Sequence, residues 1–227
     1  MNFKKAFLSF SVCCVCFISK GISQETKTDN LKDTTTKKTT VSLSVSPQFS
    51  VGYLNLNNSI VNNGLDIDFN LLFNSTKEKK QQFKIGFGYN YQYLTINSDK
   101  LLFANKDSLW FKNTGANLKT NRLALFYFTV PLIYSNQLSS NFKFQVGVNN
   151  KFLFLQENYI EENLPYSTRT TEKMYQNTNF NSYQAEAFVR VGIYKSLYVE
   201  FKQSLTKVSN YSNFSNRPYS FSLGINL

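Results

Sequence analysis

The sequence predicts an all-β fold, namely an eight-stranded antiparallel up-and-down transmembrane β-barrel. Three observations predict it. From Val41 to Leu227, apolar and polar residues alternate with a period of two. The links between the alternating segments are long and short in turn. Glycines and charged residues share one face of the strands, whereas aromatic residues gather on the other.

The composition fits one domain without histidine chemistry. The chain has 227 residues, a formal net charge of +11 and no histidine, and all-β barrels of this size commonly fold as one unit. Its aromatic content is high, at 16%. Without histidine there is no Ser-His-Asp or Cys-His pair, no His-ligated zinc and no imidazole base. We therefore expect no catalytic residue, no metal site and no cofactor.

Residues 1–23 read as a cleaved secretory signal peptide. Two lysines form its positive start, residues 6–18 form an apolar run too short for an anchoring helix, and small residues precede a cleavage site between Ser23 and Gln24. All three cysteines lie in this segment, and none follows a Gly, Ala or Ser, which disfavours a lipoprotein signal. The exported domain is expected to have no thiol.

Residues 24–40 are polar, rich in threonine and lysine, and almost free of apolar side chains. Such a segment cannot bury enough surface to offset its ordering entropy. We expect a disordered periplasmic linker here, and a barrel over residues 41–227.

Four strands are expected in the first part of the barrel. Residues 41–53 alternate Ser, Gln and Gly with Val, Leu, Phe and Tyr. Residues 65–73 alternate Asp and Asn with Leu, Ile and Phe, and residues 83–93 alternate Lys, Gly, Asn and Gln with Phe, Ile and Tyr. Residues 123–134 are apolar on both faces, so this fourth strand has the weakest alternation.

Four more strands follow. Residues 142–148 alternate Phe and Val with Lys, Gln and Gly, and residues 183–193 alternate Tyr, Ala, Val and Ile with Gln, Glu, Arg and Gly. Residues 197–201 and 219–227 continue the same pattern. A tilted crossing needs strands of about 9–11 residues. In hydrocarbon every backbone polar group must be paired, which only helices and closed barrels achieve.

The links between the strands alternate in length. Long links are expected at 55–63, 97–120, 156–182 and 207–217, and short ones at 74–82, 135–141 and 194–196. Transmembrane barrels of the outer membrane have short periplasmic turns and long external loops. We therefore expect both chain termini in the periplasm, and mobile external loops at 97–120 and 156–182.

Two residue patterns favour a membrane barrel over a soluble one. The glycines of the strands all lie on the polar face: Gly52, Gly86, Gly88, Gly147, Gly192 and Gly224. In a narrow eight-stranded interior, glycines make room for long side chains. Six tyrosines lie on the apolar face near the loop ends, as in an interfacial girdle: Tyr53, Tyr89, Tyr91, Tyr93, Tyr183 and Tyr219.

The fourth and fifth strands resemble a known family. The run LFYFTVPLIY over residues 125–134, followed by a short turn and the run FQVGV over residues 144–148, is similar to a signature of the Bacteroidota outer-membrane "porin family", which includes PorT-like proteins. The resemblance implies an eight-stranded outer-membrane barrel, and for PorT-like members a part in a secretion apparatus. Thr129 replaces the usual Glu of the family, so no role of that carboxylate carries over.

Residues 219–227 form an apolar-alternating strand at the end of the printed sequence. It resembles the C-terminal signal by which the barrel-assembly machinery recognises its substrates, although the last residue is Leu227 rather than an aromatic one. The expected partners are thus outer-membrane lipid and this machinery, with secretion-system components as a further candidate. The lysines are scattered rather than clustered, so we expect no nucleic acid partner.

Charged residues on the inward face are the candidate site. Asp66 and Asp68 could form a carboxylate pair or a cation site, but we expect them to line the lumen, neutralised by Lys84 on the next strand. A three-residue turn at 194–196 would place Arg190 opposite Glu200 and Glu186 diagonal to Lys202. We expect these seven residues to form a lumen charge cluster with a structural role.

Three functions remain open at this point. The leading one is a non-enzymatic outer-membrane barrel with a mostly filled polar lumen and a structural, loop-display or secretion-accessory role. The second is a narrow passive pore. The third is a soluble exported ligand-binding barrel, in which Phe83, Phe87, Phe144 and Phe221 would point inward around a cavity. A lipid-modifying barrel enzyme is disfavoured because the chain has no histidine.

Overall fold

A computed structural model describes the parts of the chain on which the following account rests. The described residues are 43–56, 61–75, 80–97, 100–104, 109–113, 118–162, 172–174, 180–193, 196–209 and 217–227. The signal peptide and linker expected at residues 1–40 lie outside them. In the described part of the chain, no helix has the length and apolar character that crossing a membrane requires.

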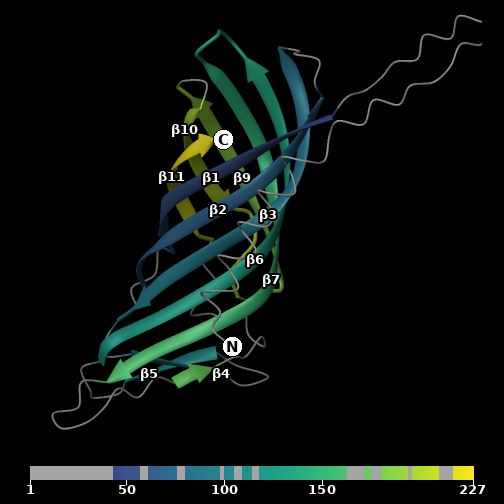
Figure 1. The fold of residues 1–227 in the computed structure, drawn as a ribbon. Coiled ribbons are helices and arrows are strands. Elements are labelled where there is room, and N and C mark those ends of the chain that lie inside the picture. The colour runs from purple at the N-terminus through teal and green to yellow at the C-terminus, as the bar shows by residue number, and fades with distance from the viewer. Residues whose placement is uncertain are drawn as a thin grey trace, which may run out of the picture. The chain divides into compact units, whose positions relative to one another are not determined.

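The predicted fold is confirmed: the structure is a closed antiparallel barrel of eight strands (Figure 1). The barrel strands are β1 (Leu43–Asn55), β2 (Val61–Ser75), β3 (Gln81–Ile96), β6 (Leu118–Gln137), β7 (Lys143–Glu162), β9 (Tyr183–Gly192), β10 (Leu197–Ser204) and β11 (Tyr219–Asn226). Consecutive barrel strands pair with each other, and β1 pairs with β11 to close the circle. Closure gives each of these eight strands a partner on both sides, which removes free edges from the barrel itself.

Two of the expected long loops contain strands. Within 97–120, β4 (Lys100–Ala104) and β5 (Leu109–Asn113) form a separate two-stranded sheet. Within 156–182, β7 continues to Glu162 and pairs with β8 (Glu172–Met174). Parts of both segments are therefore strand rather than loop. β7 runs past its predicted end because its backbone pairing with β6, 20 residues in each strand, continues beyond the clear alternation in hydropathy. A period-two pattern reports only the part of a strand with one apolar face.

The strands turn their polar face inward and their apolar face outward. One exposed apolar side chain from each barrel strand shows this: Val51, Leu65, Phe87, Leu132, Phe152, Val189, Phe201 and Leu223. Of the six tyrosines expected in a girdle, Tyr53, Tyr89 and Tyr183 are exposed, and the other three are partly exposed. Neighbouring outward rings contact one another, as in the pairs Tyr91–Phe126 and Phe201–Phe221, each 4.8 Å between centroids.

Glycines inside the barrel make room for large side chains, as the sequence predicts. A Cβ atom on Gly147 would lie 2.6 Å from Cζ of Phe188, and one on Gly224 would meet the ring of Tyr198. Both rings point into the lumen from neighbouring strands. The narrow interior therefore needs residues without a side chain opposite its large ones.

The interior changes in character from one end to the other. At the end where the chain enters β1 and leaves β11, which we call the turn end, Gln48 pairs with Asn226. Charged side chains fill the middle. At the opposite end, the loop end, ten buried residues form an apolar cluster: Leu54, Leu56, Val61, Leu94, Ile96, Leu123, Leu125, Tyr127, Phe180 and Val208.

Candidate functional site

A network of buried charges in the middle of the lumen is the candidate site. Lys202 lies at its centre, and its Nζ contacts carboxylate oxygens of both Asp66 and Asp68. The same nitrogen lies 3.8 Å from Oε1 of Glu200. All four residues are almost fully buried. One ammonium group thus holds two carboxylates from β2 together across the interior of the barrel.

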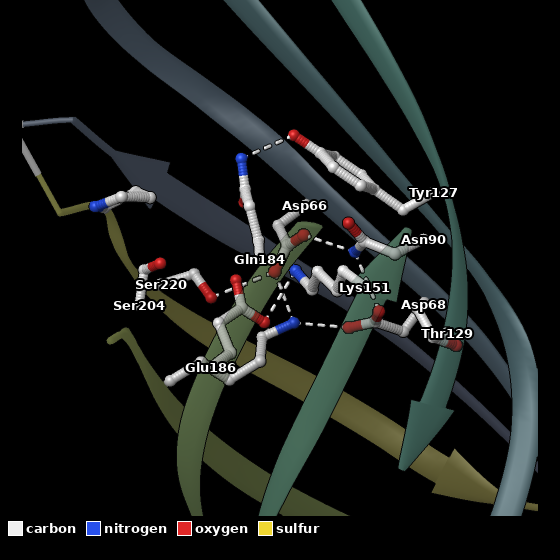
Figure 2. Close-up of polar contacts among 12 residues, drawn as sticks. Asp66, Asp68, Asn90, Tyr127, Thr129, Lys151, Gln184, Glu186, Ser204 and Ser220 are labelled. Atoms are coloured by element: carbon white, nitrogen blue, oxygen red, sulfur yellow. Dashed lines mark hydrogen bonds and ion pairs between the residues drawn. The ribbon is translucent and has the colours of Figure 1, made fainter. Parts of the chain in front are cut away.

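Neutral side chains complete the bonding of the two aspartates. Nδ2 of Asn90 donates to Asp66 Oδ1 at 2.6 Å and to Asp68 Oδ1 at 2.8 Å. Ser220 Oγ donates to Asp66 Oδ2 at 3.0 Å (Figure 2). Buried carboxylates need such partners because an unpaired buried charge is strongly unfavourable. This pair is therefore fully engaged by protein groups, and Lys202 occupies the position that a bound cation would take.

A second ion pair lies toward the turn end. Arg190 and Glu200 are direct cross-strand partners on β9 and β10, and Arg190 Nε and Nη2 donate to Glu200 Oε2 at 2.9 and 2.6 Å. Arg190 Nη1 donates to Gln48 Oε1 at 2.6 Å. The guanidinium also lies 4.1 Å from the ring centroid of Tyr198, in a cation–π contact. Charge, hydrogen bonds and stacking together fix this side chain.

A third ion pair joins β7 and β9. Lys151 Nζ lies 2.6 Å from Glu186 Oε2, and both side chains are buried. Next to it, Gln184 Nε2 donates to the hydroxyl of Tyr127 at 2.8 Å. Figure 2 shows these four residues around the same part of the lumen as the two aspartates. The Lys151–Glu186 pair and the Lys202 ion pairs thus lie in the same part of the lumen.

The predicted register of β9 and β10 is observed. The ion-pair partners of Glu186 and of the two aspartates, however, differ from those predicted. Arg190 lies opposite Glu200, and Ser204 lies opposite Glu186, which leaves Lys202 diagonal to Glu186. The ion partner of Glu186 is nevertheless Lys151. Lys151 belongs to the strand extension that the sequence prediction missed. The sequence does contain a pattern that indicates this residue: Lys151 continues the inward alternation of Lys143, Gln145 and Asn149.

The expectation that Lys84 neutralises Asp66 and Asp68 is wrong. The observed register places Asn90 opposite Asp68 and Gln92 opposite Asp66. Lys84 is six residues away from Asn90 along β3, or about 20 Å at the rise of a strand. It therefore lies in the turn-end part of the lumen, and Lys202 takes its expected role.

Thr129 stands where the resembling family has a glutamate. It is buried in the lumen, and its Oγ1 donates to Asn70 Oδ1 at 2.8 Å. Its direct cross-strand partner on β7 is Lys151, so a carboxylate at this position would face that cation. The hydroxyl leaves Lys151 to pair with Glu186 and keeps one hydrogen bond of its own.

The apolar cluster closes the lumen at the loop end. Leu54, Leu94, Leu123 and Leu125 are each at most 1% exposed, and they project inward from three strands. Among the described residues, a polar solute that passed the ion pairs would next meet this apolar cluster. The arrangement suits mechanical rigidity better than transport, since a permeating ion would have to break buried pairs and enter an apolar layer.

Comparison with known proteins adds two structures of low similarity. No protein-family model matches the sequence, and no curated protein matches it. Neisserial surface protein A (NspA) matches with 12% identity and a TM-score of 0.45, over 82% of this chain and 98% of that chain. Ail, the attachment invasion locus protein of Yersinia pestis, solved with the heparin analogue sucrose octasulfate, matches with 9% identity and a TM-score of 0.31. That match covers 81% of this chain and 99% of Ail.

Proposed function

We propose that this chain is an integral outer-membrane β-barrel that acts as a rigid scaffold for external loops, and that it is neither an enzyme nor an open pore. The observation that carries the proposal is the apolar outer surface. Phe83 is 84% exposed and Leu223 is 69% exposed, and every barrel strand contributes such residues. Apolar surface that surrounds a whole domain is favourable against hydrocarbon and unfavourable in water.

The inside supports a scaffold rather than a pore. The buried ion pairs fill the middle of the lumen, and the apolar cluster fills its loop end. The soluble ligand-binding alternative required Phe83, Phe87, Phe144 and Phe221 to point inward. Phe83, Phe87 and Phe221 are instead exposed, and Phe144 shares the outer face. A cavity for an apolar ligand is therefore not supported by these residues.

The orientation follows from the loops. Short links lie at the turn end, where β1 begins and β11 ends, and three of the four links at the other end are longer. The exception is the link between β1 and β2, which was expected to be long at 55–63 but is short because β2 begins at Val61. In outer-membrane barrels the short turns face the periplasm. We accordingly place the β4–β5 hairpin and the end of β7 outside the cell, with export through the signal peptide and recognition of β11 by the assembly machinery.

The experiment compares boiled and unboiled protein on a denaturing gel after extraction from the outer-membrane fraction. A closed barrel stays folded in the detergent and migrates differently until it is boiled. Reconstitution into planar bilayers tests the second half of the proposal, and we expect no stable conductance. Protein that remains in solution without detergent would overturn the membrane assignment, whereas steady channel openings would overturn only the scaffold role.

A secretion-accessory role is the finer proposal that the family resemblance supports. It rests on the motif over residues 125–134 and 144–148 rather than on the lumen. If it holds, photo-crosslinkers placed on the β4–β5 hairpin should capture defined envelope proteins in living cells, and loss of the hairpin should reduce secretion while the barrel still inserts. Normal secretion after deletion of the whole gene would reject it.

A further inference from the structure

The turn-end part of the lumen contains positive charge that the buried ion pairs do not balance. Lys84 lies on the inward face of β3 and is only 8% exposed. Lys143 lies on the inward face at the start of β7 and is partly exposed. Among the described residues, no carboxylate forms an ion pair with either lysine. A buried ammonium group normally has such a partner.

The two lysines are directed toward each other. Their side chains interact directly, and Arg190 is a further cation that acts on both. Glu200 already engages Arg190. Two adjacent ammonium groups repel each other, and burial strengthens that repulsion because the local dielectric constant is low. The repulsion is relieved either by a negative charge between the two groups or by loss of a proton from one of them.

An amide donor next to the lysines is also without a partner. Gln145 follows Lys143 on the inward face of β7 and is 2% exposed, and its Nε2 makes no hydrogen bond within the described structure. The register places Gln145 between Ser135 on β6 and Arg190 on β9. Lys84 lies level with Gly147, the next inward residue of β7, through the β6 residue Ile133.

We propose that Lys84, Lys143 and Gln145 form a binding site for a water-soluble oxyanion, such as a phosphate or carboxylate group, inside the turn-end opening of the barrel. Two ammonium groups and one amide N–H supply donors for a group with several oxygens, and charge-assisted hydrogen bonds are the stronger kind. The donors face the lumen, so the anion enters from the aqueous phase at the turn end. Lipid, which contacts only the outer surface, does not reach them.

The test is isothermal titration of inorganic phosphate into the full-length barrel in a neutral detergent, against chloride at equal ionic strength. We expect saturable phosphate binding by the native protein. Lys143→Gln should bind at least about tenfold more weakly, the change expected when one charge-assisted hydrogen bond is lost. Lys143→Arg keeps the charge and should retain most of the affinity. Lys80→Gln removes an exposed lysine at the same end and should bind like the native protein.

Lys84→Gln is a second variant for the phosphate titration, and its folding is checked by the heat-dependent gel shift. If Lys84→Gln does not fold, the variants of the half-buried Lys143 still test the proposed site. Equal phosphate binding in Lys143→Gln and Lys80→Gln would overturn the site. So would binding of phosphatidylglycerol vesicles in place of free phosphate, because that would place the anion contact on the outer surface. Absence of any phosphate binding by the native protein would overturn it as well.

Discussion

Arg190 and Glu200 face each other across β9 and β10, and two guanidinium nitrogens of Arg190 donate to the same oxygen of Glu200 at 2.9 and 2.6 Å. The pair is almost fully buried, so neither charge can be solvated if its partner is removed. Removing one partner of such a pair destabilises a protein more than replacing both partners does. Comparing a single with a double variant therefore tests the pair.

Arg190→Met should lower the free energy of unfolding by about 3–5 kcal/mol, because it leaves the Glu200 carboxylate buried without its cation. The double variant Arg190→Met with Glu200→Gln should recover part of that loss. Unfolding by urea in lipid vesicles, followed by circular dichroism of the strands or by the gel shift, measures both. Arg217→Gln, at an exposed position, is the control and should change stability by less than about 0.5 kcal/mol. A double variant less stable than the single one would contradict the pairing.

Lys202→Met should be among the most damaging single substitutions in the barrel. It leaves two adjacent carboxylates, Asp66 and Asp68, buried and in repulsion, with an expected loss of several kcal/mol. The triple variant with Asp66→Asn and Asp68→Asn removes the charge imbalance and should restore folding, as judged by the heat-dependent shift. The same loss in Lys207→Met, at an exposed lysine that follows β10, would contradict a specific role of the buried Lys202.

Gly224→Ala should destabilise the barrel by about 1–3 kcal/mol through overpacking, because the new methyl group would collide with the Tyr198 ring. Gly192→Ala is the matched control on the same inward face. Its nearest atom is Cβ of Lys143 at 3.3 Å, so the neighbour has to move only slightly. Adding Tyr198→Leu to Gly224→Ala should make the glycine substitution much less harmful. Additive effects of the two substitutions would contradict a direct collision.

Val189→Arg on the outer surface of β9 tests the membrane assignment. At the centre of an apolar band, an outward arginine costs about 2–4 kcal/mol, falling to about 0–1 kcal/mol near an interface. Tyr183→Arg, at the loop end of the same strand, should therefore be tolerated. In a water-soluble barrel Val189, already 43% exposed, could become arginine with almost no change in stability. Equal tolerance at both positions would argue against a bilayer around β9.

The alternation of residues was sufficient to predict all eight barrel strands and the inward face of seven of them, whereas residues 123–134 are apolar on both faces. It could not predict β4, β5, β8 or the far half of β7. β4, β5 and β8 have only three to five residues each, too few for a period of two to be recognised. In β7 the predicted strand stopped at residue 148, so Lys151 was missed although it continues the inward alternation.

The sequence by itself determined the barrel, its inward glycines and the cross-strand contact of Arg190 with Glu200, because period and turn length together set the register of neighbouring strands. Only the tertiary structure decided which charges meet across the lumen. Asp66 and Lys202 lie far apart in the chain and on strands that do not pair, and their contact depends on how closure of the barrel brings opposite walls together. Local pattern specifies neighbours in a sheet, whereas contacts through the interior depend on the diameter and stagger of the closed barrel.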